Sequence, residues 1–353
     1  GEWLVTYSAT ASQTFSDNIV QEPDGEREAG FITRAGPGIF ITGSSARVVG
    51  AFNGSLIGVY QVGGDDEGFS LDPAIVGTST TELSPNHVFF DLSGSVRREL
   101  LDSRETTSAS GASTSNRDLV AAFTASPYLV HQLGDFADVE WRYRFSPTFV
   151  EASDRSDTLS HEASLVLDSG EEFSRLGWTF SNVARLEDRS RESDIKSANT
   201  DLGLSYPLWH GFTLLGGIGY EYRTGDEDEG DNFEGVTWLG GFRYEPHPDL
   251  NLEATYGHRN NDNSLDALLN YQIGPNTTLT ASYAEVLETG QGRAESNLRE
   301  VIIDPDTGEI VANGDDPFTF EDETTRTRTL RLDATHINGN NIFGLTALGG
   351  NSE

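Results

Sequence analysis

The sequence predicts an all-β protein whose strands form one large antiparallel sheet. About seventeen short stretches alternate apolar and polar residues, the period of two that sends successive side chains to opposite faces of a strand. The connections alternate too: a turn of a few residues follows one stretch, and a longer, often acidic segment follows the next. This is the wiring of a bacterial outer-membrane β-barrel. We therefore expect a large transmembrane β-barrel with short periplasmic turns and long acidic extracellular loops.

The strands are expected in sequence order, starting from the periplasmic side. Their predicted ranges are 2–16, 31–43, 46–62, 69–83, 87–100, 118–133, 137–152, 158–168, 175–187, 194–208, 211–224, 235–246, 249–259, 263–274, 277–289, 325–337 and 341–350. Each has roughly 9–15 residues, enough to cross a bilayer at a tilt of about 45°. Because bacterial single-chain barrels have even strand numbers, we expect a complete barrel of about 18 or more strands around a water-filled lumen. The chain of 353 residues is then one barrel domain that lacks its C-terminal strand or strands.

The alternation is clearest where aromatic residues mark one face. In 137–152, Trp141 and Tyr143 lie on one face and charged residues lie on the other, and the pattern recurs in 87–97, 212–223, 250–258 and 328–335. Charges of both signs fit a wet lumen better than the outside of a soluble sheet. The residues expected to face the lumen and set its selectivity are Glu140, Arg142, Arg144, Glu221, Arg223, Arg331 and Asp333.

Two interpretations of these lumen charges stay open. Opposed charges across a channel create a transverse field that selects polar solutes by size and charge. The same charges also fit a wet wall held together by salt bridges, each contributing about 0–1 kcal/mol. The sequence gives the two interpretations equal weight.

Composition excludes several classes of protein. With 57 acidic and 23 basic residues, the formal charge is -34, which argues against binding nucleic acid. Hydrophobic residues make up only 36% of the chain, as expected when only the outward half of each strand is apolar. Cysteine is absent, so thiol catalysis and disulfides are excluded. Methionine is also absent and the chain opens at Gly1, from which we expect a mature form whose signal peptide is removed.

Aromatic residues near the predicted strand ends fit the membrane–water interface, where an apolar ring body meets a wet edge. Trp3, Tyr60, Trp209 and Trp238 are in such places, and Trp209 directly precedes a short turn. The alternative is that five tryptophans are ordinary for this length. We favour an aromatic girdle.

Two outer loops raise the question of a metal. The run 225–231 is strongly acidic, and Asp226, Asp228 and Asp231 could hold a loosely bound Ca²⁺, although the spacing is not that of an EF-hand. A solvated loop, bridged loosely by divalent ions to lipopolysaccharide, is favoured over a dedicated site. The longest loop, 290–324, contains Asp304-Pro305-Asp306-Thr307-Gly308 between two short apolar runs, which predicts a small hairpin rather than a calcium site. A loop of this length can fold into the barrel mouth and constrict it.

The sequence carries no recognisable catalytic motif. None of its seven histidines falls in an H-E-x-x-H setting, and no G-x-S-x-G occurs around a candidate nucleophile. We therefore expect no enzymatic activity and no cofactor beyond the loosely bound Ca²⁺. A barrel-embedded hydrolase is the weakest alternative.

Four segments resemble a known family. Residues 5–19, 30–39, 43–47 and 125–129 contain Ser16-Asp17-Asn18, Phe31-Ile32-Thr33 with Pro37-Gly38-Ile39, Gly43-Ser44-Ser45-Ala46-Arg47, and Ser126-Pro127-Tyr128-Leu129. They are similar to outer-membrane β-barrels found near exopolysaccharide and PEP-CTERM/exosortase loci, over about the first 150 residues. The resemblance implies a barrel tied to polysaccharide export or surface assembly, without catalytic residues.

We therefore expect a porin-like channel in the outer membrane of a Gram-negative bacterium that lets polar solutes or saccharides pass passively. Its acidic outer mouth should favour cations. The expected surroundings are outer-membrane lipid and lipopolysaccharide, with a polysaccharide or a surface protein as a further partner. The alternative is a structural anchor that holds a surface layer, a filament or a partner through its acidic loops.

Overall fold

The computed structural model describes residues 1–19, 28–63, 67–100, 117–151, 155–225, 232–288, 293–296, 302–303, 310–311, 325–338 and 341–352. Seventeen strands form one sheet, as predicted, and β16 and β17 form a second, two-stranded sheet. The large sheet consists of β1 (Glu2–Ser16), β2 (Gly30–Ser44), β3 (Val48–Val62), β4 (Gly68–Ser84), β5 (Val88–Leu100), β6 (Arg117–Gln132), β7 (Ala137–Val150), β8 (Thr158–Ser169), β9 (Gly177–Arg189), β10 (Ile195–Trp209), β11 (Phe212–Thr224), β12 (Phe233–His247), β13 (Leu250–Arg259), β14 (Asp262–Gln272), β15 (Thr277–Glu288), β18 (Thr325–Asn338) and β19 (Asn341–Ser352).

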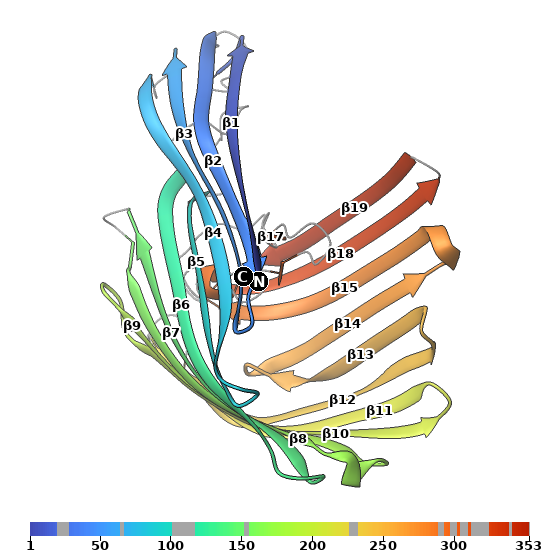
Figure 1. The fold of residues 1–353 in the computed structure, drawn as a ribbon. Helices are drawn as coiled ribbons and strands as arrows, with labels where there is room; N and C mark the ends of the chain where they lie inside the picture. Colours follow the sequence, from blue (N-terminus) through green and yellow to red (C-terminus); the bar gives the residue numbers. More distant parts are fainter. Residues whose placement is uncertain are drawn as a thin grey trace.

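The strands pair in the order in which they occur along the chain. Each is antiparallel to the next, from β1 with β2 to β14 with β15, and then β15 with β18 and β18 with β19. The sheet curves strongly around an interior (Figure 1). This architecture is that of a large outer-membrane β-barrel, the predicted fold class.

Short turns gather at one rim because residues that tolerate positive φ stand at the reversals. Asn86, Gly134, Gly211 and Gly274 have φ of 57°, 60°, 73° and 67°, and each lies between strands that pair directly. The opposite rim carries the longer connections, with one exception. The loop predicted at 260–262 is a two-residue turn, because Asp262 already belongs to β14 and pairs with Arg259.

The distribution of polar and apolar side chains is inverted relative to that of a soluble protein. Among the described residues, the fully buried side chains are mostly hydroxyl-bearing, such as Ser126, Ser146 and Thr148, whereas many large apolar residues are exposed, including Tyr7 at 77% and Leu345 at 70%. A soluble fold would bury such residues. Contact with lipid on the outside and water on the inside accounts for both observations.

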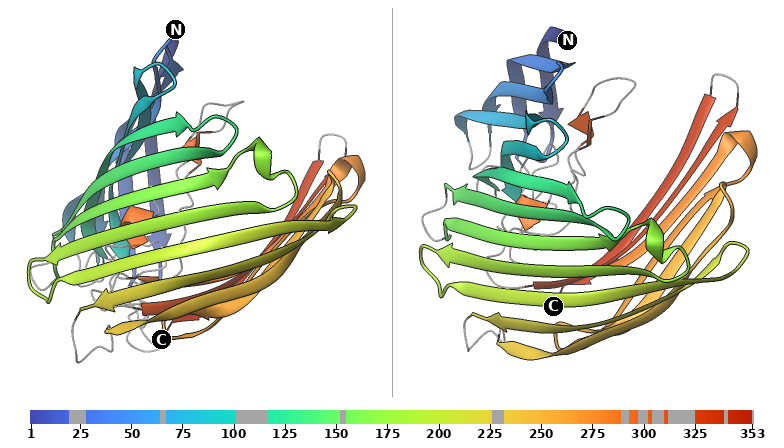
Figure 2. Two further views of the ribbon diagram at one scale, coloured as in Figure 1. Left: turned by 90° about the horizontal axis from the view of Figure 1, so that it is seen from below. Right: turned by 60° about the horizontal axis from the view of Figure 1, so that its bottom comes forward.

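The connection between β15 and β18, residues 289–324, contributes three described pieces. β16 (Ile302–Ile303) pairs with β17 (Ile310–Val311), which confirms the predicted hairpin. β17 lies against β3. Residues 293–296 form a helical turn whose Ala294 packs on Val120 and Ala122 of β6. Figure 2 shows these short orange pieces within the curve of the large sheet.

The face that contacts this insertion is the polar one. Val120 and Ala122 share their face of β6 with Ser126, since residues at even spacing point the same way. The exposed Phe123 lies on the other face. The concave side is therefore the lumen and the convex side is apolar. No helix in the described part of the chain is long and apolar enough to cross a membrane.

Candidate functional site

The inner wall carries a charged cluster centred on Arg142 of β7. Its Nε donates to Glu140 at 2.7 Å and its Nη1 donates to Asp91 at 2.7 Å. Nη1 also donates to Ser126 Oγ at 3.1 Å, and the guanidinium lies 3.7 Å from the ring centroid of Tyr128. The strand registers bring these groups together, because Asp91 is opposite Ser126 and Tyr128 is opposite Arg142. These contacts fix the position of the guanidinium, so its positive charge stays at one place on the inner wall.

A second cluster lies next to it on β7, β8 and β9. Glu162 is opposite both Arg144 and Arg185, accepts a hydrogen bond from Arg144, and lies 3.9 Å from Arg185 Nη1. Arg185 Nη2 also donates to Glu187 at 3.1 Å. Both carboxylate side chains are almost fully buried, with 6% and 5% exposed. Buried carboxylates of this kind are stable only when they are paired.

The inserted segment 293–296 completes this second cluster. Glu295 Oε2 lies 2.8 Å from Arg185 Nη2, and the Glu295 side chain is 3% exposed. Beside it, Ala294 packs against Val120 and Ala122. The contacts that attach the insertion to the inner wall include this apolar contact, this ion pair and a hydrogen bond of 3.5 Å from Arg293 to Thr327 of β18. This agrees with the expected inward folding of the 290–324 loop, for the residues of it that the structure describes.

The other predicted lumen residues lie further round the sheet. Glu221 of β11 accepts the backbone N–H groups of Asn260 and Asn261 at 2.9 and 3.2 Å, so its carboxylate holds the β13–β14 turn. Arg223 lies two residues further along β11, on the same face. On β18, Arg331 donates to Asp333 at 2.6 Å. The structure thus brings Glu140 and Arg142 together, and Arg331 and Asp333, while these groups stand on separate parts of the wall.

A cavity of about 390 Å³, lined by both polar and apolar residues, lies across β10–β14. Asp201, Glu221, Thr237 and Asp266 are among its lining residues. Thr237 Oγ1 donates to Asp201 at 3.3 Å, and Arg259 donates to both oxygens of Asp266 at 3.0 and 2.9 Å. Hydroxyls and carboxylates of this kind can replace water around a polar solute.

Sequence reasoning missed part of the wall. The alternation of β5 and β8 contains Asp91 and Glu162, but which arginine each one meets depends on strand register. Glu295 lies in a loop without periodicity, and nothing in the sequence distinguishes it from its acidic neighbours. Arg185 could have been found from its alternation with the apolar residues of β9.

The suggested Ca²⁺ ligands Asp226, Asp228 and Asp231 lie outside the described residues. Within the part of the chain that is described, no three His, Asp or Glu side chains stand close enough together to hold a metal ion.

Comparisons with known proteins give likeness in structure alone. No protein-family model matches this chain, and neither does any curated protein. Among solved structures, the F5-1 and F3-3 variants of the FrpB iron transporter from Neisseria meningitidis are similar, with TM-scores of 0.50 and 0.51, each at 11% identity. The match covers 99% and 100% of this chain, and 63% and 62% of those chains. The chain thus spans less than two thirds of the length of the structures it matches.

At this identity the likeness establishes the fold. It supports the large outer-membrane barrel that the inverted surface and the strand pairing already indicate.

Proposed function

We propose that this chain is an outer-membrane transport barrel that gives polar solutes, including saccharides, a passive path through its lumen. The observation that carries the proposal is the pairing of an apolar convex face with a concave face built from hydroxyls and ion pairs. A polar wall lowers the free-energy cost of moving a hydrated solute across the hydrocarbon layer. The resemblance of the first 150 or so residues favours a link to exopolysaccharide export.

Selectivity follows from fixed charges on the wall. Arg142 and Arg144 lie on β7 and Arg185 lies on β9, on the other side of β8, and each is close to at least one carboxylate. Paired charges of opposite sign leave a strong local field without a large net charge. Such a field orients dipolar solutes as they pass.

The insertion between β15 and β18 narrows this path. Glu295 reaches the wall at Arg185, and β17 reaches it at β3, so the described pieces of the insertion contact distant parts of the sheet. The ion pair between Glu295 and Arg185 is a polar link between the insertion and the wall that a single neutral substitution can remove. We expect its removal to loosen the insertion and widen the path.

Solute-driven swelling of liposomes that contain the full-length protein tests this proposal. We expect swelling in small saccharides that slows as the sugar becomes larger, and faster swelling with Glu295→Gln for the larger sugars. The matched control is Glu253→Gln, which removes another ion-paired carboxylate, 2.7 Å from Arg243 and without a hydrogen bond or ion pair to the described residues of the insertion. Adding a soluble ferric-iron complex in parallel checks the solute named for the similar FrpB structures, which is iron.

Folded protein that causes no swelling in any sugar would contradict a passive path. That result would favour the alternative role of a structural anchor. Equal swelling of wild type and Glu295→Gln would contradict the proposed role of the ion pair in setting the width.

A further inference from the structure

The convex face of the sheet carries an apolar groove of about 350 Å³. Its floor lacks bulky side chains. Gly50 on β3 stands opposite Ser79 on β4, and Gly77 on β4 stands opposite Gly94 on β5. These four small residues share the outward face, so they form a continuous depression across three strands.

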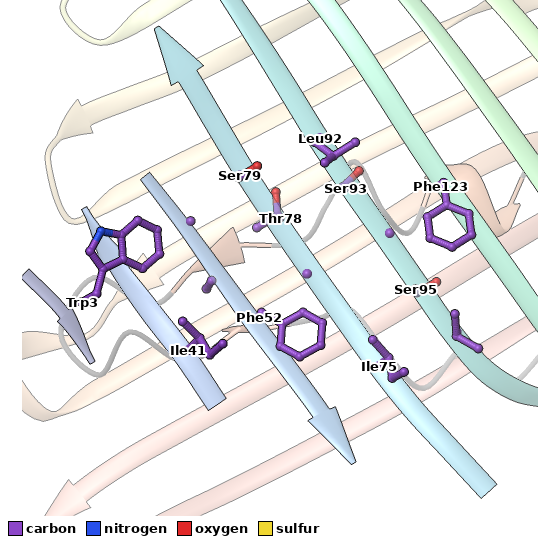
Figure 3. A pocket seen from close by; sticks show the side chains of 15 residues that line it. Trp3, Ile41, Phe52, Ile75, Thr78, Ser79, Leu92, Ser93, Ser95 and Phe123 are labelled. Carbon is purple, nitrogen blue, oxygen red and sulfur yellow. The ribbon is translucent and has the colours of Figure 1, made fainter. Parts of the chain in front are cut away.

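Apolar side chains surround this floor. In Figure 3, Trp3 and Phe123 stand at opposite ends of the groove, Leu92 lies on one side, and Phe52 and Ile75 lie on the other. Trp3, Leu92 and Phe123 remain 49%, 48% and 43% exposed, although each has neighbours along the groove. They therefore offer apolar surface to an occupant rather than to one another.

The rings fit closely against the glycines. A Cβ atom at Gly94 would lie 2.8 Å from Phe123 Cδ1, and one at Gly77 would lie 3.1 Å from Phe52 Cδ2. Rings that cover glycines in this way compensate for the missing side chains in a sheet. A larger residue at Gly77 or Gly94 would fill the groove.

The groove runs from the rim of short turns toward the middle of the strands. Trp3 and Gly50 lie near the rim of short turns, whereas Gly94 and Phe123 lie near the middle of their strands. That rim faces the periplasm in this class of barrel. Tryptophan favours the level of the lipid headgroups, and Arg47 is exposed in the turn between β2 and β3 at the same rim.

We propose that this groove binds one acyl chain of a phospholipid from the periplasmic leaflet. The chain lies along the apolar side chains that line the groove, and its phosphate lies at the level of Trp3 and Arg47. The groove is continuous with the apolar face that the barrel presents to lipid, so an acyl chain is the occupant already in contact with it. An unfilled depression would forfeit dispersion contacts along its whole lining. The inference rests on the barrel being in a membrane and not on solute passage.

Native mass spectrometry of the full chain, with palmitoyl-oleoyl phosphatidylglycerol as the added lipid, tests the proposal. The groove-filling variant is Gly77→Leu/Gly94→Leu. The matched control is Gly216→Leu/Gly240→Leu, because Gly216 and Gly240 are also directly opposed on the convex face and have no atom within 4 Å of an added Cβ. Far-UV circular dichroism verifies that each variant folds.

We expect wild type and control to retain one lipid under activation that strips the others. Retention in the groove-filled variant should fall roughly tenfold, the loss that corresponds to about two buried methylene groups. Equal retention by all three proteins would overturn the proposal.

A second measurement leaves the groove intact and so does not depend on the folding of that variant. Two proteins keep a single tryptophan, either Trp3 or Trp209, which also lies at the short-turn rim and is 63% exposed. Both are reconstituted in phosphatidylcholine vesicles with a small fraction of phosphatidylglycerol brominated in its acyl chain. We expect stronger quenching of Trp3 fluorescence than of Trp209 fluorescence. Equal quenching would mean that Trp3 meets only bulk lipid.

Discussion

At the residue scale, one guanidinium organises much of the inner wall. Arg185 faces the carboxylates of Glu162, Glu187 and Glu295, each of which is at most 6% exposed. Arg144 also pairs with Glu162, so this carboxylate interacts with arginines of two strands. The planar fork of arginine suits this task because it donates in several directions at once.

We predict that Arg185→Ala lowers the free energy of unfolding by about 3 kcal/mol, since it removes one cationic partner from three buried carboxylates. Arg331→Ala is the control, because Arg331 is 52% exposed and its pair with Asp333 is worth less than about 1 kcal/mol. Urea unfolding of the full chain in micelles measures both. Similar losses for the two variants would show that burial of the Arg185 cluster is unimportant.

The sequence predicted which charged residues alternate with the aromatic ones, but not their partners. Arg142 was expected on the polar side of its strand, yet its contact with Asp91 depends on the registers of β5, β6 and β7. Alternation determines on which face of the sheet a side chain lies, whereas strand register determines which residues of the adjacent strands it contacts. Whether the seven predicted residues select solutes stays a prediction.

At the element scale, alternation and turn residues located all seventeen strands closely. The predicted 2–16 is identical to β1, and the predicted 118–133 differs from β6 by one residue at each end. The shortest connection at the rim of longer loops is the β13–β14 turn. There Asn260 and Asn261 have φ of 51° and 58°, and the Glu221 carboxylate accepts both of their N–H groups. Two adjacent asparagines in left-handed conformation are a hairpin signal.

We predict that Asn261→Ala destabilises the protein by about 1 kcal/mol, because alanine tolerates positive φ poorly. Asn261→Gly should have wild-type stability, since glycine adopts this conformation without steric cost. Urea midpoints measured on the full chain distinguish the two. Equal midpoints for Asn261→Ala and Asn261→Gly would contradict the backbone explanation.

At the scale of the whole molecule, the fold class was predictable because lipid and water impose opposite demands on alternate residues. The docking of the insertion was not. Ala294 and Glu295 meet β6 and β9 from more than a hundred residues away in sequence, and no local pattern encodes such a contact. The width of the proposed path would therefore depend on a contact that only the three-dimensional arrangement reveals.

Ion preference also depends on a property of the whole molecule, its net charge. The formal charge of -34 attracts cations to the barrel, and the attraction is screened over about 10 Å at 0.1 M salt and about 3 Å at 1 M. Single-channel recording of the full-length protein in a planar bilayer under a KCl gradient measures this directly. We expect stable conductance steps whose reversal potential has the sign for K⁺ and becomes smaller as total salt rises. Anion-selective steps, or a folded barrel that stays electrically silent, would contradict it.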